Sequence, residues 1–143
     1  MPKPILFIDD EPYYARHYVE SLQKAGHTVV FEDNATSGLA YLMNNASSLS
    51  LVILDYMMPT PDGVPETDTF DGLATGRWVL RQARDLLESY DLPVLVLTNR
   101  NVETVKTEIG EFTLMKVGKL IRVRHKTETS RSYLPVFVEQ FLN

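Results

Sequence analysis

The 143-residue chain contains no cysteine. It can therefore form no disulfide and offers no thiolate as a nucleophile or as a ligand for zinc or an iron-sulfur cluster. The chain also lacks an apolar run near the roughly 20 residues that cross a bilayer. Its start, Met1-Pro2-Lys3-Pro4, lacks the apolar region of a signal peptide. We therefore expect a soluble, cytoplasmic protein with no membrane partner, whose chemistry uses carboxylates, hydroxyls, histidine, lysine or arginine.

Basic residues are scarce in the first half of the chain. Residues 1–76 hold 11 acidic and 3 basic residues, whereas residues 77–143 hold 8 acidic and 11 basic residues, within a total net charge of −5. The acidic total argues against a nucleic-acid partner. The uneven distribution predicts two surfaces of opposite charge.

Short apolar runs alternate with amphipathic segments of helix length, which is typical of an α/β domain with a parallel sheet. The length fits one domain over residues 1–143. The strands are expected at residues 4–8, 28–31, 49–54, 92–97 and 120–125. The helices are expected at residues 12–25, after the capping residue Asn34, and at residues 72–90, 102–115 and 134–141. A hairpin turning at Gly118-Lys119 is the alternative for residues 112–125.

Polar residues follow four of the predicted strands at the point where each strand ends. Asp9 and Asp10 follow the first strand, Asp55 the third, Thr98 the fourth and Lys126 the fifth. In open parallel sheets the ligand crevice lies beyond the carboxyl ends of the strands. We therefore expect these five side chains to meet at one edge of the sheet.

The chemistry of these five residues indicates phosphoryl transfer at a metal site. Three close carboxylates raise each other's pKa unless a cation joins them, and hard oxygen ligands favour Mg2+. Lys126 can neutralise phosphoryl oxygens, Thr98 can donate a hydrogen bond, and a carboxylate can attack. Asp55 stands alone on the central strand, which favours it as the nucleophile. Asp9 and Asp10 are adjacent and better placed to hold the metal.

The order of these motifs resembles the receiver domains of two-component response regulators. The resemblance covers nearly the whole chain and rests on five motifs at strand ends: Asp9-Asp10-Glu11, Asp55 with Met58-Pro59, Asp62-Gly63, Thr98, and Lys126. It implies a flavodoxin-like (βα)5 fold, a three-layer sandwich with the parallel sheet order 2-1-3-4-5. It also implies that Asp55 accepts a phosphoryl group from a histidine kinase or a histidine phosphotransfer protein.

The resemblance also assigns the ligands of the site. It implies that Mg2+ is held by Asp10, by Asp55 and by the backbone carbonyl of Met57, and by Asp9 through water. Thr98 and Lys126 would then coordinate the phosphoryl group and couple it to a conformational switch.

The predicted function is that of a stand-alone receiver, a phosphoacceptor domain that catalyses its own phosphotransfer and is otherwise no enzyme. With no output domain it would act through an unknown downstream protein, as a monomer or weak homodimer. The expected output surface is formed by the fourth helix, the fifth strand and the last helix. That surface carries a basic cluster, for which a solvated edge is the alternative interpretation: Lys116, Lys119, Arg122, Arg124, Lys126 and Arg131.

Three positions depart from the receiver pattern. Asn99 replaces the usual small residue after the threonine, Arg124 stands where an aromatic switch residue is common, and Thr127 replaces the usual proline after the lysine. These changes are compatible with phosphate acceptance and put the usual coupling in doubt. Lys116 and Lys119 compete with Lys126 as the phosphate lysine, and Lys126 is preferred because an apolar strand-like run ends just before it.

The segment of residues 56–71 is rich in proline and has no basic residue, which predicts an acidic loop. A second Asp-Gly pair, Asp71-Gly72, resembles the usual start of the following helix. Residues 64–70 therefore resemble an insertion beside the site, either a lid, a docking element or merely a long surface loop.

Two other functions stay open. A degenerate receiver could act as a phosphorylation-independent docking module, which the departures at Asn99 and Arg124 would suit. A phosphohydrolase of the haloacid dehalogenase type would use Asp9 as its nucleophile. That family wants a second aspartate two positions later, where this chain has Glu11 followed by Pro12.

Overall fold

The computed structural model describes residues 2–110 and 120–143. Its core is a five-stranded parallel sheet in the order β2-β1-β3-β4-β5. The strands are β1 (Ile5–Ile8), β2 (Val29–Glu32), β3 (Leu51–Asp55), β4 (Val94–Thr98) and β5 (Ile121–His125). This order confirms the predicted fold class, with β3 at the centre and the arginine-bearing β5 at an edge.

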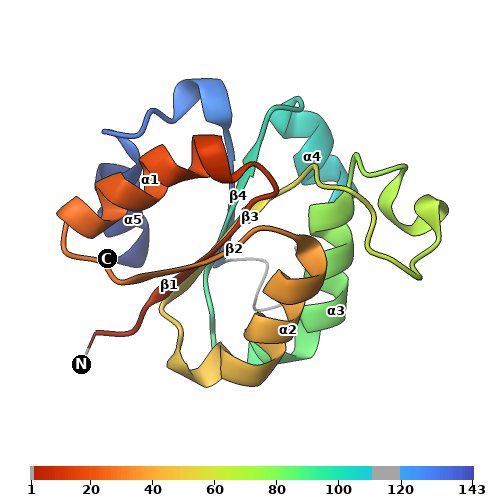
Figure 1. Cartoon of the computed structure of the whole chain (residues 1–143), viewed down its shortest axis with the longest axis horizontal. Coiled ribbons are helices and arrows are strands. Elements are labelled where there is room, and N and C mark those ends of the chain that lie inside the picture. The colour runs from red at the N-terminus through yellow and green to blue at the C-terminus, as the bar shows by residue number, and fades with distance from the viewer. Residues whose placement is uncertain (1, 111–119) are drawn as a thin grey trace.

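Helices cover both faces of the sheet, so that the domain has three layers (Figure 1). The helices are α1 (Pro12–Lys24), α2 (Ala35–Asn45), α3 (Thr75–Ser89), α4 (Val102–Glu108) and α5 (Leu134–Leu142). Helices α1 and α5 pack on one face, and α2, α3 and α4 pack on the other. Among the residues that the structure describes, no helix combines the length and apolarity needed to cross a membrane.

The two faces of β1 show why its sequence is apolar throughout. Ile5 and Phe7 lie in the core beneath α1 and α5, whereas Leu6 and Ile8 lie in the core beneath α2 and α3. Side chains alternate between the faces of a strand, and a parallel sheet covered on both sides buries both sets. The continuous apolar run therefore follows from the layered architecture.

Helix α3 begins later than the sequence predicts. Residues 72–90 were expected to be helical, yet Gly72 has a φ of +86° and the helix starts at Thr75. A left-handed residue cannot continue a right-handed helix, so the stretch before Thr75 is a turn. Leu73 lies in this turn and is half-exposed.

The helix after β4 was expected over residues 102–115, with a hairpin over residues 112–125 as the alternative. Helix α4 ends at Glu108. Residues 111–119 lie outside the described part of the chain, so both the predicted end of this helix at Gly118 and the first arm of the hairpin fall there.

The acidic loop after β3 contains a short 3-10 helix, η2 (Glu66–Thr69), and projects at the right of Figure 1. The buried hydroxyl of Thr69 lies 2.6 Å from that of Thr60, which also donates to Glu66. The loop therefore has internal order, and residues 64–70 form its outer turn.

Helix α3 packs unusually closely against the end of β3. A Cβ placed on Gly76 would lie 2.9 Å from Cα of Tyr56 and 3.2 Å from the carbonyl oxygen of Asp55. The amide of Gly76 donates to the carbonyl of Tyr56 at 2.9 Å. Glycine is therefore what allows α3 to support the backbone at the end of the central strand.

We expect Gly76→Ala to lower the free energy of unfolding by about 1–3 kcal/mol, because the added methyl group overpacks this contact. Urea or thermal unfolding measures the change. Gly110→Ala is the control, since a Cβ there meets nothing within 4 Å. Equal stability losses in both variants would contradict the close approach.

Candidate functional site

The register of the sheet aligns the predicted site residues at one edge. Ile8 pairs with Leu54, so Asp9 and Asp55 each lie one position further on, on adjacent strands. Asp55 pairs with Leu97, just before Thr98, and Thr98 pairs with His125, just before Lys126. Parallel pairing therefore brings the strand ends together, as the sequence predicts.

Lys126 forms ion pairs with two of the carboxylates. Its Nζ lies 3.1 Å from Oδ2 of Asp9 and 3.4 Å from Oδ1 of Asp55. The side chains of Asp9 and Asp55 are only 2% and 6% exposed, and that of Lys126 is 15% exposed. The other oxygen of Asp9 accepts a hydrogen bond from the amide of Glu11 at 2.8 Å. Two buried carboxyl groups are thus paired with one ammonium group.

Asp10 completes the carboxylate cluster, and one of its oxygens lacks a donor among the described residues. One oxygen from each of Asp9, Asp10 and Asp55 lies within 4.8 Å of the others. Within the described part of the chain, Oδ1 of Asp10 is buried without a hydrogen-bond partner. Ionised carboxylates accept only, so a proton or a cation shared by these oxygens would relieve their repulsion. An all-oxygen set with one unsatisfied atom fits a hard cation such as Mg2+.

Burial, followed by the negative charge of Asp9, raises the pKa of Asp55 to about 8. The contact with Asp10 acts in the same direction, and Lys126 opposes it. For Lys126, burial alone would lower the pKa of the ammonium group, but Asp55 and Asp9 outweigh burial and raise it. The ammonium group therefore stays charged, and one positive charge is too little to balance three carboxylates.

Thr98 is fully buried at the end of β4. Its hydroxyl oxygen accepts a hydrogen bond from the amide of Arg100 at 2.9 Å. The next residue, Asn99, is exposed, and its carbonyl oxygen lies 3.1 Å from Nε2 of His125. The loop after β4 is thereby joined to the end of β5, next to Lys126.

A cavity of about 600 Å³ opens beside Asp9 and Lys126. Helix α1 contributes Tyr14 and His17 to its wall, and Arg131 comes from the segment that precedes α5. Of the three clustered carboxylates, Asp9 lines this cavity. Asn99 also lines this cavity.

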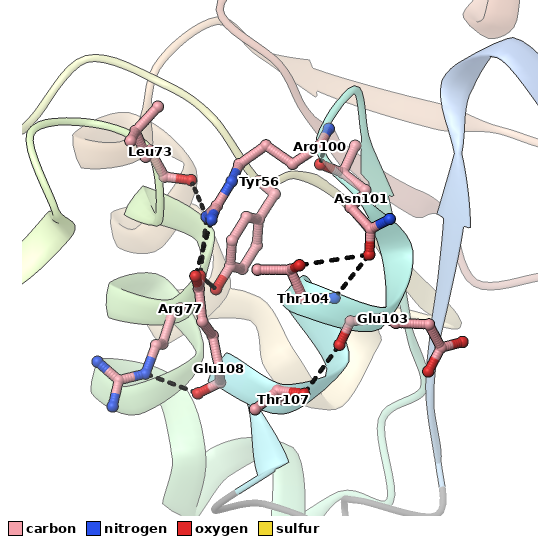
Figure 2. A network of polar contacts seen from close by, with 10 residues as sticks. Tyr56, Leu73, Arg77, Arg100, Asn101, Glu103, Thr104, Thr107 and Glu108 are labelled. Atoms are coloured by element: carbon pink, nitrogen blue, oxygen red, sulfur yellow. Dashed lines mark hydrogen bonds and ion pairs between the residues drawn. The ribbon is translucent and has the colours of Figure 1, made fainter.

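Sequence reasoning missed a second polar cluster, which begins at the residue after Asp55 (Figure 2). The buried Tyr56 donates its phenolic hydrogen to Oε1 of Glu108 at 2.8 Å. Arg100 forms two 2.8 Å hydrogen bonds to the same carboxylate. Tyr56 lies 52 positions before Glu108 in the chain, and neither spacing nor periodicity signals their contact.

Glu108 is held ionised by its two donors. Burial alone would raise its pKa, but the hydrogen bonds from Arg100 and Tyr56 outweigh burial and lower it. Its backbone carbonyl also accepts a hydrogen bond from Nε of Arg77 on α3 at 2.9 Å. The last residue of α4 is therefore joined to α3 and to both loops that border the carboxylate cluster.

Two arginines of the basic cluster contact aromatic side chains of α5 and of the residue before it. The guanidinium of Arg124 lies 4.9 Å from the ring centroid of Phe137 and 5.1 Å from that of Tyr133, and that of Arg122 lies 5.2 Å from Phe141. Cation–π contacts of this kind stabilise packing between β5 and α5. Lys126 pairs with Asp9 and Asp55, and a guanidinium nitrogen of Arg131 lies 3.3 Å from Nδ1 of His17. All four members of the cluster that the structure describes therefore make contacts within the protein.

Two competing lysines and one predicted ligand remain without a structural test. Lys116 and Lys119 lie outside the described residues. Met57 follows Tyr56 in the turn after β3 and is partly buried, and its carbonyl oxygen stays a predicted metal ligand.

Many solved structures that share this fold are response regulator receiver domains. One is a receiver domain protein (CheY-like) from Methanospirillum hungatei JF-1, with 19% identity, a TM-score of 0.69 and coverage of 99% of this chain and 94% of that one. Another is the receiver domain from the hybrid histidine kinase CckA, with 22% identity, a TM-score of 0.65 and coverage of 98% and 99%. A third, from Clostridium thermocellum, has 19% identity, a TM-score of 0.65 and coverage of 99% and 94%.

No protein-family model matches the sequence, and no curated protein matches it significantly. The likeness is therefore one of structure at low sequence identity. It establishes that the chain has the receiver-domain fold over nearly its whole length.

The lowered pKa of Glu108 predicts a pH-dependent contribution to stability. A carboxylate with a lowered folded-state pKa stabilises the protein above its ordinary pKa of about 4.3, and this contribution is lost as pH falls through the lower folded value. We expect the gap in unfolding free energy between the native protein and Glu108→Gln to be largest at neutral pH and to narrow in acid. Denaturant unfolding over this pH range measures it.

Glu103→Gln is the control, because it removes an 83% exposed carboxylate from the same helix. We expect it to change stability by less than about 0.5 kcal/mol. A gap for Glu108→Gln that stays constant or widens in acid would show that the carboxylate is not stabilised as described.

Proposed function

We propose that this chain is a signalling receiver that accepts a phosphoryl group on Asp55 in a Mg2+-dependent reaction. The observation that carries the proposal is the cluster of three carboxylates, of which Asp9 and Asp55 pair with Lys126, while the buried Oδ1 of Asp10 has no hydrogen-bond partner among the described residues. The receiver-domain fold supports it, because the cluster lies where the sheet order places a ligand crevice.

The proposed donor is a phosphohistidine on a histidine kinase or a histidine phosphotransfer protein. A carboxylate oxygen of Asp55 attacks phosphorus, and the new P–O bond forms as the P–N bond breaks. The electron pair of the broken bond leaves with the imidazole nitrogen, which takes a proton from solvent. The cavity beside Asp9 and Lys126 is wide enough to admit a partner's side chain.

The side chains around Asp55 have separate roles in this proposal. Lys126 hydrogen-bonds to one phosphoryl oxygen, and Thr98 donates its hydroxyl hydrogen to another. Asp10, Asp55 and the carbonyl of Met57 would hold the metal directly, with Asp9 acting through water. The metal supplies positive charge that the transferred oxygens and the three carboxylates need. The product would signal in the cytoplasm through a downstream protein.

We expect the native protein, incubated with Mg2+ and acetyl phosphate, to gain one phosphoryl group, and we expect Asp55→Asn to gain none. Intact-protein mass spectrometry measures the modified fraction. Asp62→Asn is the control, since it removes an exposed carboxylate from the loop after β3 and should be modified as the native protein is. Unchanged modification of Asp55→Asn would exclude Asp55 as the acceptor.

Mg2+ binding is tested separately from phosphorylation. We expect Mg2+ to raise the melting temperature of the native protein, because a ligand at 100 times its Kd adds about 2.7 kcal/mol of stability. Asp10→Asn should need a markedly higher Mg2+ concentration for the same rise. Glu11→Gln, which alters an exposed neighbour, should respond as the native protein does, and identical responses of all three would refute the assigned ligand.

A degenerate receiver that only docks to a partner is the second candidate. The observation that favours it is the position of Arg124, which packs between two aromatic rings of α5 and its flank where a receiver commonly has an aromatic switch residue. Absence of both Mg2+ binding and phosphorylation, with the fold intact, would support this alternative.

A further inference from the structure

The carboxylate of Glu108 connects α4 to Tyr56, which follows Asp55, and to Arg100 in the loop after β4. It is the last residue of α4, and its side chain is 19% exposed. It accepts three hydrogen bonds of 2.8 Å, one from Tyr56 and two from Arg100. Figure 2 shows these side chains converging on it from the ends of β3 and β4. A partly buried carboxylate with three such hydrogen bonds is held in one position.

Tyr56 joins this carboxylate to the phosphoacceptor strand. It directly follows Asp55, its side chain is fully buried, and its amide donates to the carbonyl of Leu97 on β4 at 3.1 Å. Its carbonyl accepts from Gly76 on α3. Because hydrogen bonds hold the backbone of Tyr56 on both sides, the residue moves together with Asp55. A shift of the Asp55 backbone therefore also moves the phenolic hydroxyl that donates to Glu108.

Arg100 joins the same carboxylate to Thr98. Its amide donates to the Thr98 hydroxyl at 2.9 Å, while its guanidinium donates to Glu108 and to the carbonyl of Leu73 at 3.1 Å. Bidentate arginine–carboxylate pairs fix distance and orientation together. A change in the position of the Thr98 hydroxyl therefore alters where the guanidinium can hold α4.

We propose that Glu108 is a positioning residue that couples Asp55 and Thr98 to α4, through Tyr56 on one side and Arg100 on the other. The proposal rests on the proposed function, because it takes phosphorylation of Asp55 as the input. When the Thr98 hydroxyl rotates to donate to a phosphoryl oxygen, its hydrogen bond from the amide of Arg100 is weakened or lost. The pair with Glu108 then readjusts, and α4 moves with its last residue.

The chain offers variants that remove single links of this cluster. Tyr56→Phe deletes only the phenolic oxygen and keeps the buried ring. Glu108→Gln keeps the shape of the side chain and removes its charge. Glu103→Gln is the matched control on the same helix, because its carboxylate is 83% exposed and takes no part in the cluster.

The experiment is hydrogen exchange of peptides covering α4, with and without Mg2+ and acetyl phosphate. Intact mass gives the phosphorylated fraction for each variant, so the exchange change can be expressed per phosphorylated molecule. We expect phosphorylation to alter exchange of α4 in the native protein and in Glu103→Gln. In Glu108→Gln and in Tyr56→Phe this change should fall by at least about threefold, as expected when a contact in one network is broken.

In the double variant Tyr56→Phe/Glu108→Gln, the phosphorylation-dependent change in exchange of α4 should be no smaller than in Glu108→Gln alone. Both substitutions act on the same hydrogen bond, so their effects should not add. Circular dichroism and the melting temperature show whether each variant folds, and Tyr56→Phe keeps the test valid if Glu108→Gln does not. A native-sized change in exchange of α4 in either folded single variant would overturn this inference alone. Phosphorylation of the native protein without any change in exchange of α4 would do the same. Absence of phosphorylation on the native protein would overturn the proposed function and this inference with it.

Discussion

The pairing of one ammonium group with two buried carboxylates is the interaction on which this structure depends. Lys126 lies within 3.4 Å of both Asp9 and Asp55, and all three side chains are largely withdrawn from water. Buried charges without partners are strongly unfavourable, so removing the lysine would leave two of them uncompensated. Asp10 adds a third carboxylate that Lys126 does not neutralise. The site is thus built with an excess of negative charge, which a divalent cation can balance.

The parallel register creates this constraint, and the sequence carries most of the information needed to predict it. Each apolar run ends in a polar residue, and parallel strands bring such ends to one edge. The strand order, the two-sided core, the helix start at Pro12 and the capping residue Asn34 all agree with expectation. The structure brings Asp9, Asp10, Asp55 and Lys126 together, and places Thr98 at the same edge. Their chemical roles remain proposals.

Other features depend on contacts that no local pattern reveals. Tyr56 and Glu108 are joined across α4 and the end of β3, and a buried phenol in a sequence resembles any apolar core residue. The arginines of β5 look like a solvated edge in the sequence, yet aromatic side chains of α5 lie against them. Leu73 has the spacing of an apolar position of α3, but Gly72 has a left-handed conformation and the helix starts only at Thr75, so Leu73 lies outside it. In each case tertiary packing, and not the periodicity of the sequence, determines the environment of the side chain.

The central claim is that Asp55, among the clustered carboxylates, accepts the phosphoryl group. The most direct measurement is borohydride reduction of the protein after incubation with Mg2+ and acetyl phosphate, followed by peptide mass spectrometry. Reduction converts an aspartyl phosphate into homoserine and so marks the acceptor permanently. We predict homoserine at position 55 and unmodified aspartate at positions 9 and 10. Homoserine at position 9 or 10, or at none of the three, would contradict the account.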